Sequence, residues 1–139
     1  MMREIKFRGL GIFDAEWAYG GISNVLPEST AIIEKNYKHG EVPSAHVVDP
    51  KTVGQYTGLK DKNGTEIYDG DIYKRYDSIY VVIFYGFGFK CKQLYDSWLN
   101  KNVYNRNEIS LLSEVDSGYC YEVIGNIHEN PDLLESGKE

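Results

Sequence analysis

The stretch VGQYTGLKDKNGTEIYDGDI, from Val53 to Ile72, decides the fold class of this chain. Its short apolar runs are interrupted twice by residues of the Asn, Asp and Gly type. These residues accept a positive φ or bond their own backbone, as tight hairpin turns require. The stretch therefore predicts turns at Asn63-Gly64 and Asp69-Gly70 around a short strand at 65–68. A preceding strand is expected to end at Gly58.

Similar patterns extend on the N-terminal side. The segment 4–24, EIKFRGLGIFDAEWAYGGISN, predicts a β-hairpin with its turn near Asp14 and Ala15. Gly9 and Gly11 indicate a bulge or a close approach of the backbone. For AIIEKNY, at 31–37, a strand and a helical turn are both open.

The rest of the chain alternates strand and turn signals. Ala45–Val48 predicts a strand, and Asp49 followed by Pro50 a helical start. The apolar segment 78–95 predicts buried strands that bend at Gly86–Gly88, and the asparagine-rich segment 97–110 favours a loop. GYCYEVIGNIHEN, at 118–130, predicts the last strand. Asn130 and Pro131 then begin a helical turn.

Composition agrees with these patterns. Aromatic residues form 14% of the 139-residue chain, and such residues favour strands. We therefore expect a mainly β fold, a small and partly open SH3-like barrel with an N-terminal β-hairpin subdomain and short helical turns. The length fits one domain over 1–139. The alternative is two packed subdomains, an N-terminal β part at about 1–50 and a barrel-like part at 51–139.

Charge and cysteine content bear on setting and partners. The formal net charge of −6 disfavours a protein that coats nucleic acid without sequence preference. Pairs of basic residues close together in sequence could still contact nucleic acid locally. No apolar run resembles a signal peptide or is long enough to span a bilayer, so we expect no membrane association. Cys91 and Cys120 are then expected to be free thiols in a reducing cytoplasm, with a disulfide between them as the alternative.

Three segments resemble the YopX family of phage and prophage proteins. They are REIKFRG…EWAYG within 3–20, VDPKTVGQYTGLKDKNGTEIYDGDI at 48–72, and YEVIGNIHENPDLL at 121–134. Their order and spacing match the family as well. The intervening parts, Ser23–Val47 and Lys74–Gly118, lie outside the resemblance.

The resemblance implies a setting more than an activity. It implies a phage or prophage origin, the cytoplasm of a bacterial host, and a mainly β fold with a small barrel-like part. It carries no enzymatic activity, no cofactor and no catalytic or ligand-binding residue over to this chain. Function must therefore be argued from the residues themselves.

Metal and phosphate sites are disfavoured by spacing. Asp61, Asn63 and Glu66 resemble a fragment of a calcium loop, but the bidentate Glu expected six residues after Gly64 is Gly70. The three histidines are scattered, without the spacing of a zinc site. The two G-x-G sequences lack the third glycine and the helix of a nucleotide loop. We expect no metal and no cofactor.

A catalytic role finds little support either. Glu66, Asp69 and Asp71 lie close together in sequence, but general acid–base work needs a buried pair with shifted pKa values in a cleft. Residues that flank tight turns are normally solvated. A hydrolase that uses Asp69 and Asp71 is kept as a third hypothesis, and the chain is expected not to be an enzyme.

The aromatic surplus favours an interaction surface. Tyrosine gives contact area and a hydrogen bond together, which suits protein interfaces, although most of these rings are expected to fill the core. The candidate surface consists of Arg8, Trp17, Tyr19, Tyr56, Lys60 and Tyr68. The leading hypothesis is a non-enzymatic accessory protein that forms a homo-oligomer or binds a host or phage protein.

The runner-up hypothesis is a small-barrel module for single-stranded nucleic acid. Aromatic residues that alternate with cations, as in Phe7-Arg8 and Phe89-Lys90, are typical of surfaces on which bases stack. The acidic net charge argues against it. Salt-dependent binding of an oligonucleotide would distinguish it from the leading hypothesis.

Overall fold

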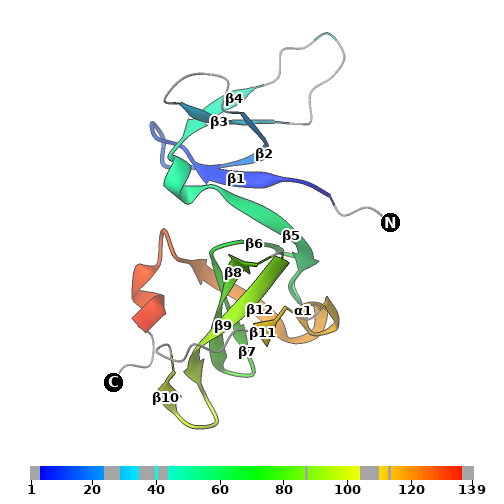
Figure 1. The fold of residues 1–139 in the computed structure, drawn as a ribbon, viewed down its shortest axis with the longest axis vertical. Coiled ribbons are helices and arrows are strands. Elements are labelled where there is room, and N and C mark those ends of the chain that lie inside the picture. Colours follow the sequence, from blue (N-terminus) through cyan, green and yellow to red (C-terminus); the bar gives the residue numbers. More distant parts are fainter. Residues whose placement is uncertain are drawn as a thin grey trace. The chain divides into compact units, whose positions relative to one another are not determined.

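A computed structural model describes residues 4–23, 29–34, 40, 44–86, 88–103, 110–112 and 114–135. The chain divides into two compact units, Met1–Tyr56 and Thr57–Glu139. Antiparallel strands dominate both units, and the described part of the chain holds one short α-helix (Figure 1). The predicted mainly β class is therefore confirmed. The strands form two open antiparallel sheets, neither of which closes into a barrel within the described residues.

The N-terminal unit is built around a hairpin. Its described elements are β1 Phe7–Leu10, β2 Trp17–Ser23, β3 Thr30–Ile33, β4 Ala45–Val48, η1 Pro50–Thr52 and the start of β5 Gly54–Lys60. They pair in the order β4-β3-β2-β1-β5. The predicted hairpin is confirmed, since β1 pairs with β2 from Phe7–Gly20 to Leu10–Trp17. The open choice at 31–37 resolves to a strand through Ile33, and residues 35–37 lie outside the described part.

The core of this unit is small. Its buried apolar members are Ala18, Ile32 and Val48. A Cβ built on Gly9 would lie 2.8 Å from Val48 Cγ2, so the predicted close approach at Gly9 is confirmed. The predicted strand and helical start also hold: β4 covers Ala45–Val48, and the Asp49 carboxylate accepts from Lys51 N at 3.0 Å.

Strand β4 also returns to the β1–β2 turn. Ile12 N donates to Val47 O at 3.1 Å, and Asp49 N donates to Leu10 O at 2.9 Å. Gly11 and Val48 form an isolated antiparallel bridge between these bonds. The curled sheet thus brings the hairpin turn beside β4.

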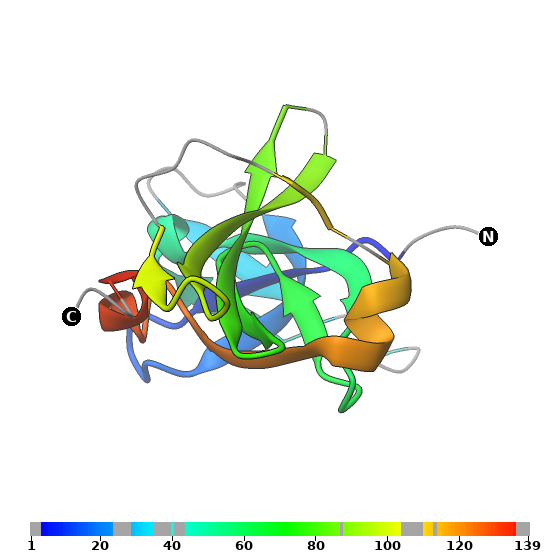
Figure 2. The same ribbon diagram turned by 90° about the horizontal axis from the view of Figure 1, so that it is seen from below.

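The C-terminal unit carries the longer strands. Its described elements are the end of β5, β6 Glu66–Tyr68, β7 Asp71–Arg75, β8 Ser78–Tyr85, β9 Gly88–Asp96, β10 Lys101–Asn102, β11 Ser110–Leu111, α1 Glu114–Cys120, β12 Tyr121–Asn126 and η2 Pro131–Glu135. β6 lies beside β5, the other strands run β10-β9-β8-β7-β12, and β11 pairs with β9. Figure 2 shows β8 and β9 as one long hairpin. The predicted bend at Gly86–Gly88 forms its end.

Two buried clusters fill this unit. The first consists of Ile67, Tyr73, Val82, Cys91 and Tyr121. The second consists of Ile72, Val81 and Leu94. Tyr73 stacks on Tyr80 and Tyr121, with ring centroids 5.2 and 4.2 Å apart. The aromatic surplus in the sequence is thus partly a core feature.

Both predicted turns in the opening stretch are present. Gly64 and Gly70 have φ values of 82° and 91°, which glycine adopts without strain. Asp61 Oδ1 accepts from Asn63 N and Thr65 N, each at 2.9 Å, and so closes the first turn. The turn chemistry read from the sequence is confirmed.

Two details differ from the sequence prediction. Strand β5 continues through Gly58 to Lys60, because Gly58 takes a φ of 86° and kinks the strand without ending it. The β7–β8 hairpin turns at Tyr76 and Asp77, whose φ values are 49° and 71°. A turn of this form usually contains Asn-Gly, so its position had no sequence signal.

The predicted last strand is confirmed over Tyr121–Asn126, but the predicted range of 118–130 is too long at both ends. Residues 114–120 form the helix α1, and β12 begins at Tyr121. Arg75 Nη2 bonds Asp116 Oδ2 at 2.8 Å and so ties the helix to β7. The two residues are 41 positions apart in sequence, so no local pattern signals the contact. The predicted final helical turn is confirmed as η2. The side chain of Asn130, the residue before this turn, accepts a hydrogen bond from Asn126 N at the end of β12.

Candidate functional site

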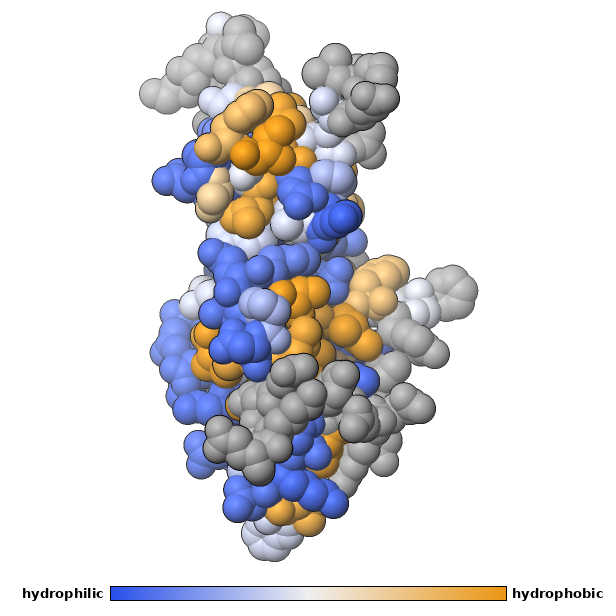
Figure 3. Space-filling model, turned by 90° about the vertical axis from the view of Figure 1, so that its left-hand side faces the viewer, coloured by the Kyte–Doolittle hydropathy of each residue, from blue (hydrophilic) through white to orange (hydrophobic). Residues whose placement is uncertain are grey.

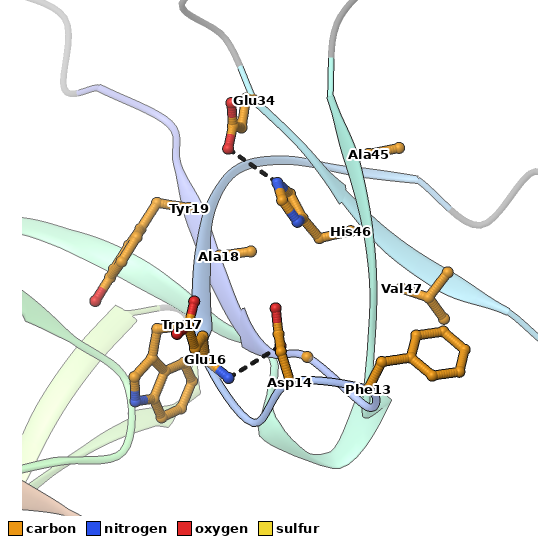
Figure 4. A pocket seen from close by; sticks show the side chains of 11 residues that line it. Phe13, Asp14, Glu16, Trp17, Ala18, Tyr19, Glu34, Ala45, His46 and Val47 are labelled. Carbon is orange, nitrogen blue, oxygen red and sulfur yellow. Dashed lines mark hydrogen bonds and ion pairs between the residues drawn. The ribbon is translucent and has the colours of Figure 1, made fainter.

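A cleft of about 520 Å³ opens between the β1–β2 turn and β4 of the N-terminal unit. Its lining residues are Gly11, Phe13, Asp14, Glu16, Trp17, Ala18, Tyr19, Glu34, Ala45, His46 and Val47. Figure 4 shows the two walls, with the turn below and β4 to the right. The cleft exists because β4 returns to the turn at Ile12 but the two segments diverge beyond it.

The rim of the cleft is apolar. Phe13 lines the cleft and is 87% exposed, and its neighbour Ile12, outside the lining, is 53% exposed. Exposure of apolar side chains to water is unfavourable. Phe13 lies beside Val47 in Figure 4. Figure 3 views the molecule from the side of this turn and shows hydrophobic residues gathered on the N-terminal unit. Exposed apolar groups beside a hollow are typical of protein contact sites.

The floor and far side of the cleft are acidic. His46 Nε2 lies 2.9 Å from Glu34 Oε1, and Asp14 Oδ1 accepts from Glu16 N at 3.1 Å. The three carboxylates of Asp14, Glu16 and Glu34 meet no Lys or Arg among the lining residues. The cleft therefore suits a cationic group, and repels phosphate.

The structure brings together only part of the predicted surface. Arg8 and Tyr19 are cross-strand partners, and the Arg8 guanidinium lies 4.5 Å from the Trp17 ring centre. Tyr56 and Tyr68 are buried, at 4% and 2% exposed. Lys60 is exposed at the end of β5. Trp17 and Tyr19 are the members of the predicted set that line the cleft.

Other residues of the cleft were missed by sequence reasoning. Asp14 was noted only as part of a turn, and Glu34 and His46 carried no signal because they converge through strand pairing. Phe13, in contrast, did carry a signal in the sequence. An Ile-Phe pair beside a predicted turn is unusual, and it marks the rim of the cleft.

Two acidic residues of the stretch Val53–Ile72, Asp61 and Asp71, accept hydrogen bonds from backbone N–H groups. Asp61 Oδ2 accepts from Val123 N at 2.9 Å, in addition to its two bonds within the turn. Asp71 is 2% exposed, and its Oδ2 accepts from Tyr68 N at 2.8 Å. These carboxylates hold turns and strands in place. Within the described residues, no three His, Cys, Asp or Glu side chains converge as metal ligands would.

Both cysteines are free, as predicted. Burial raises the pKa of the Cys91 thiol. Burial, and then the neighbouring Cys91, raise the pKa of Tyr73. Both groups therefore remain protonated at neutral pH, and Cys91 is no thiolate nucleophile there.

A second, smaller groove lies in the C-terminal unit. It has a volume of about 260 Å³ and is lined by Lys62, Lys74, Tyr76, Asp77, Tyr119, Cys120 and Glu122. Tyr76 and Tyr119 are mostly exposed. Lys62 and Lys74 both approach Glu122, at 3.9 and 3.8 Å. The groove thus combines two aromatic rings with two cations.

Comparison with known proteins bears on family and fold. The family model described as YopX protein matches residues 6–135. The crystal structure of protein EF1440 from Enterococcus faecalis is similar, with a TM-score of 0.56 and 23% identity over 96% of this chain and 100% of that one. At that identity the likeness shows a common fold alone. No curated protein matches the chain, and no helix in the described part is long and apolar enough to cross a membrane.

Proposed function

Because the chain belongs to the YopX family, we propose that it is a phage or prophage accessory protein of the bacterial cytoplasm that binds other proteins. The cleft of the N-terminal unit is its contact site. The observation that carries this proposal is the exposure of Phe13 on the rim of a preformed hollow. Exposed aromatic side chains at such places supply most of the binding energy in many interfaces.

Binding is favoured over catalysis by how the acidic residues are used. Asp71, one of the two aspartates on which the hydrolase hypothesis rests, is 2% exposed and accepts a hydrogen bond from Tyr68 N. A carboxylate held this way is a poor general base, because taking up a proton would cost that bond. The proposal therefore assigns no reaction to the chain.

Site-specific cross-linking in cells tests the contact site. A photo-reactive phenylalanine analogue replaces Phe13 in one variant and Lys51, which is exposed on η1, in the control. We expect a discrete adduct from position 13 alone. The cross-linked protein, once purified, should bind the Phe13→Ser variant roughly tenfold more weakly. Equal adducts at both positions, or equal affinity for the variant, would contradict the proposal.

Self-assembly through the C-terminal unit is part of the proposal. Trp98 is 93% exposed and Leu99 is 47% exposed, side by side in the turn between β9 and β10. Burial of such a pair against a second copy would be favourable. Light scattering over a concentration series should show a mass above that of one chain, reduced in Trp98→Ser. A constant monomer mass would rule self-assembly out.

A second candidate function is binding of single-stranded nucleic acid at the smaller groove. Tyr76 and Tyr119 present exposed rings on which bases can stack, and Lys62 and Lys74 lie beside them. Fluorescence anisotropy of a labelled oligonucleotide should then show affinity that falls with salt and with Tyr119→Ala. Absence of binding at low salt would eliminate this candidate.

A further inference from the structure

The edge of β4 that points away from β3 faces the acidic cleft, and its backbone groups point into that space. Within a strand, the N–H and C=O of one residue point to the same edge, and successive residues point to opposite edges. Val47 O accepts from Ile12 N, so Val47 points away from β3. Ala45, two residues earlier, must point the same way. The register agrees, because Glu34 N bonds Ser44 O and Ile32 pairs with His46 on the β3 side.

Among the described residues, the hairpin turn pairs with this edge at one end only. The bond from Ile12 N to Val47 O and the bridge between Gly11 and Val48 complete the pairing there. Beyond Ile12 the turn leaves β4, and Ala45 and Val47 line the cleft. An edge of this kind is a template for a further strand.

The two faces of β4 differ in chemistry beside this edge. On one face, Ala45 and Val47 lie with Phe13 (Figure 4). On the other face, His46 bonds Glu34, and the Asp14 carboxylate points toward the same space. A strand added here would meet an apolar surface on one side and carboxylates on the other.

We propose that the β4 edge binds an extended segment of a partner protein in which basic and apolar residues alternate. This inference rests on the proposed function and names its partner's chemistry. Main-chain bonds to Ala45 and Val47 would supply affinity. The carboxylates of Asp14, Glu16 and Glu34 would select lysine or arginine on one face of the segment, and Phe13 would cover the apolar residues of the other.

A synthetic peptide tests the side-chain part of the inference. The probe alternates Lys and Val over about six residues, a usual strand length. The controls alternate Glu and Val, or hold the same Lys and Val residues in two blocks. We expect the alternating Lys peptide to bind roughly tenfold more tightly than either control, and Glu34→Gln to weaken it. Equal binding of the three peptides would overturn the inference.

N-methylation of the same peptide tests the strand addition without altering the protein. All Lys N–H groups point to one edge of an extended peptide and all Val N–H groups to the other. Methylation of one set should therefore abolish binding, and methylation of the other set should leave it intact. Equal effects from both sets would overturn strand addition.

Hydrogen exchange locates the added strand on the protein. Bound peptide should slow amide exchange at Ala45 and Val47, and leave the His46 amide, which faces β3, unchanged. Protection elsewhere alone would overturn the inference. The cross-linking result at position 13 is independent of these peptides, so failure here is distinguishable from failure of the proposed function.

Discussion

The two units differ in the size of their buried apolar core, although both expose large apolar side chains. The C-terminal unit buries two clusters, one of which holds the stacked rings of Tyr73 and Tyr121 and has Tyr80 packed against it. The N-terminal unit buries one small cluster and leaves Phe13 and Ile12 exposed beside a cleft. The comparison indicates that the C-terminal unit contributes most of the stability, whereas the N-terminal unit carries the proposed contact surface.

The largest expected effect is in the C-terminal core. Tyr73→Ala removes a ring that is 1% exposed and contacts two others, so we expect the free energy of unfolding to fall by about 3–5 kcal/mol. Urea denaturation followed by circular dichroism measures this. Tyr119→Ala, at an exposed ring of α1, is the matched control and should change stability by less than about 0.5 kcal/mol. Similar losses from both variants would remove the distinction between core and surface rings.

The next effect compares two aspartates in turns. Asp61→Ala deprives three backbone N–H groups of their acceptor and should cost roughly 2–4 kcal/mol. Asp14→Ala in the N-terminal unit loses one exposed bond and should cost less than about 1 kcal/mol. Denaturation midpoints of the two variants give the comparison. If Asp14→Ala were the more damaging, the N-terminal turn would be a stability element instead of a contact surface.

Close packing in the N-terminal unit predicts an effect of intermediate size. Gly9→Ala places a methyl group 2.8 Å from Val48 Cγ2 and should cost about 1–3 kcal/mol by overpacking. Gly88→Ala in β9 meets open space and serves as the control. Thermal unfolding of both variants would reveal the difference, and a tolerated Gly9→Ala would mean that the small core can rearrange.

A substitution at Gly64 measures the cost of backbone strain without a contribution from steric clashes. Gly64→Val forces a β-branched residue to a φ of 82°, where no neighbouring atom lies within 4 Å of the added Cβ, and should cost roughly 1–3 kcal/mol. Gly64→Asn, which tolerates this conformation better, should recover much of the loss. Equal stability of the Val and Asn variants would show that the turn does not require positive φ.

The smallest effect is expected at the rim of the cleft. Phe13→Ser should change the free energy of unfolding by less than about 0.5 kcal/mol, because the ring is already in water. Chemical denaturation checks this. A large loss of stability would place Phe13 in the fold and remove the main support for the contact site.

Local chemistry predicted the turns, the hairpin and the short strand β4. The turns at Gly64 and Gly70 can be recognised from the residues next to them in sequence. Helix α1 could not be predicted this way, because its anchor is the long-range bond between Arg75 and Asp116. The cleft could not be predicted for the same reason, since strand pairing alone brings His46 close to Glu34 and to the hairpin turn. Of the residues that line the cleft, Trp17 and Tyr19 belong to the surface predicted from the sequence.

Strand β5 bears on how the gene of this protein can recombine with related genes. The boundary between the units falls between Tyr56 and Thr57, inside the strand Gly54–Lys60. Recombination with a related chain at that boundary would build β5 from two halves of different origin, which must pair with the same neighbouring strands. An exchange that keeps β5 of one origin must therefore break the gene on one side of the whole strand. The unit that carries the proposed contact surface thus shares strand β5 with the other unit.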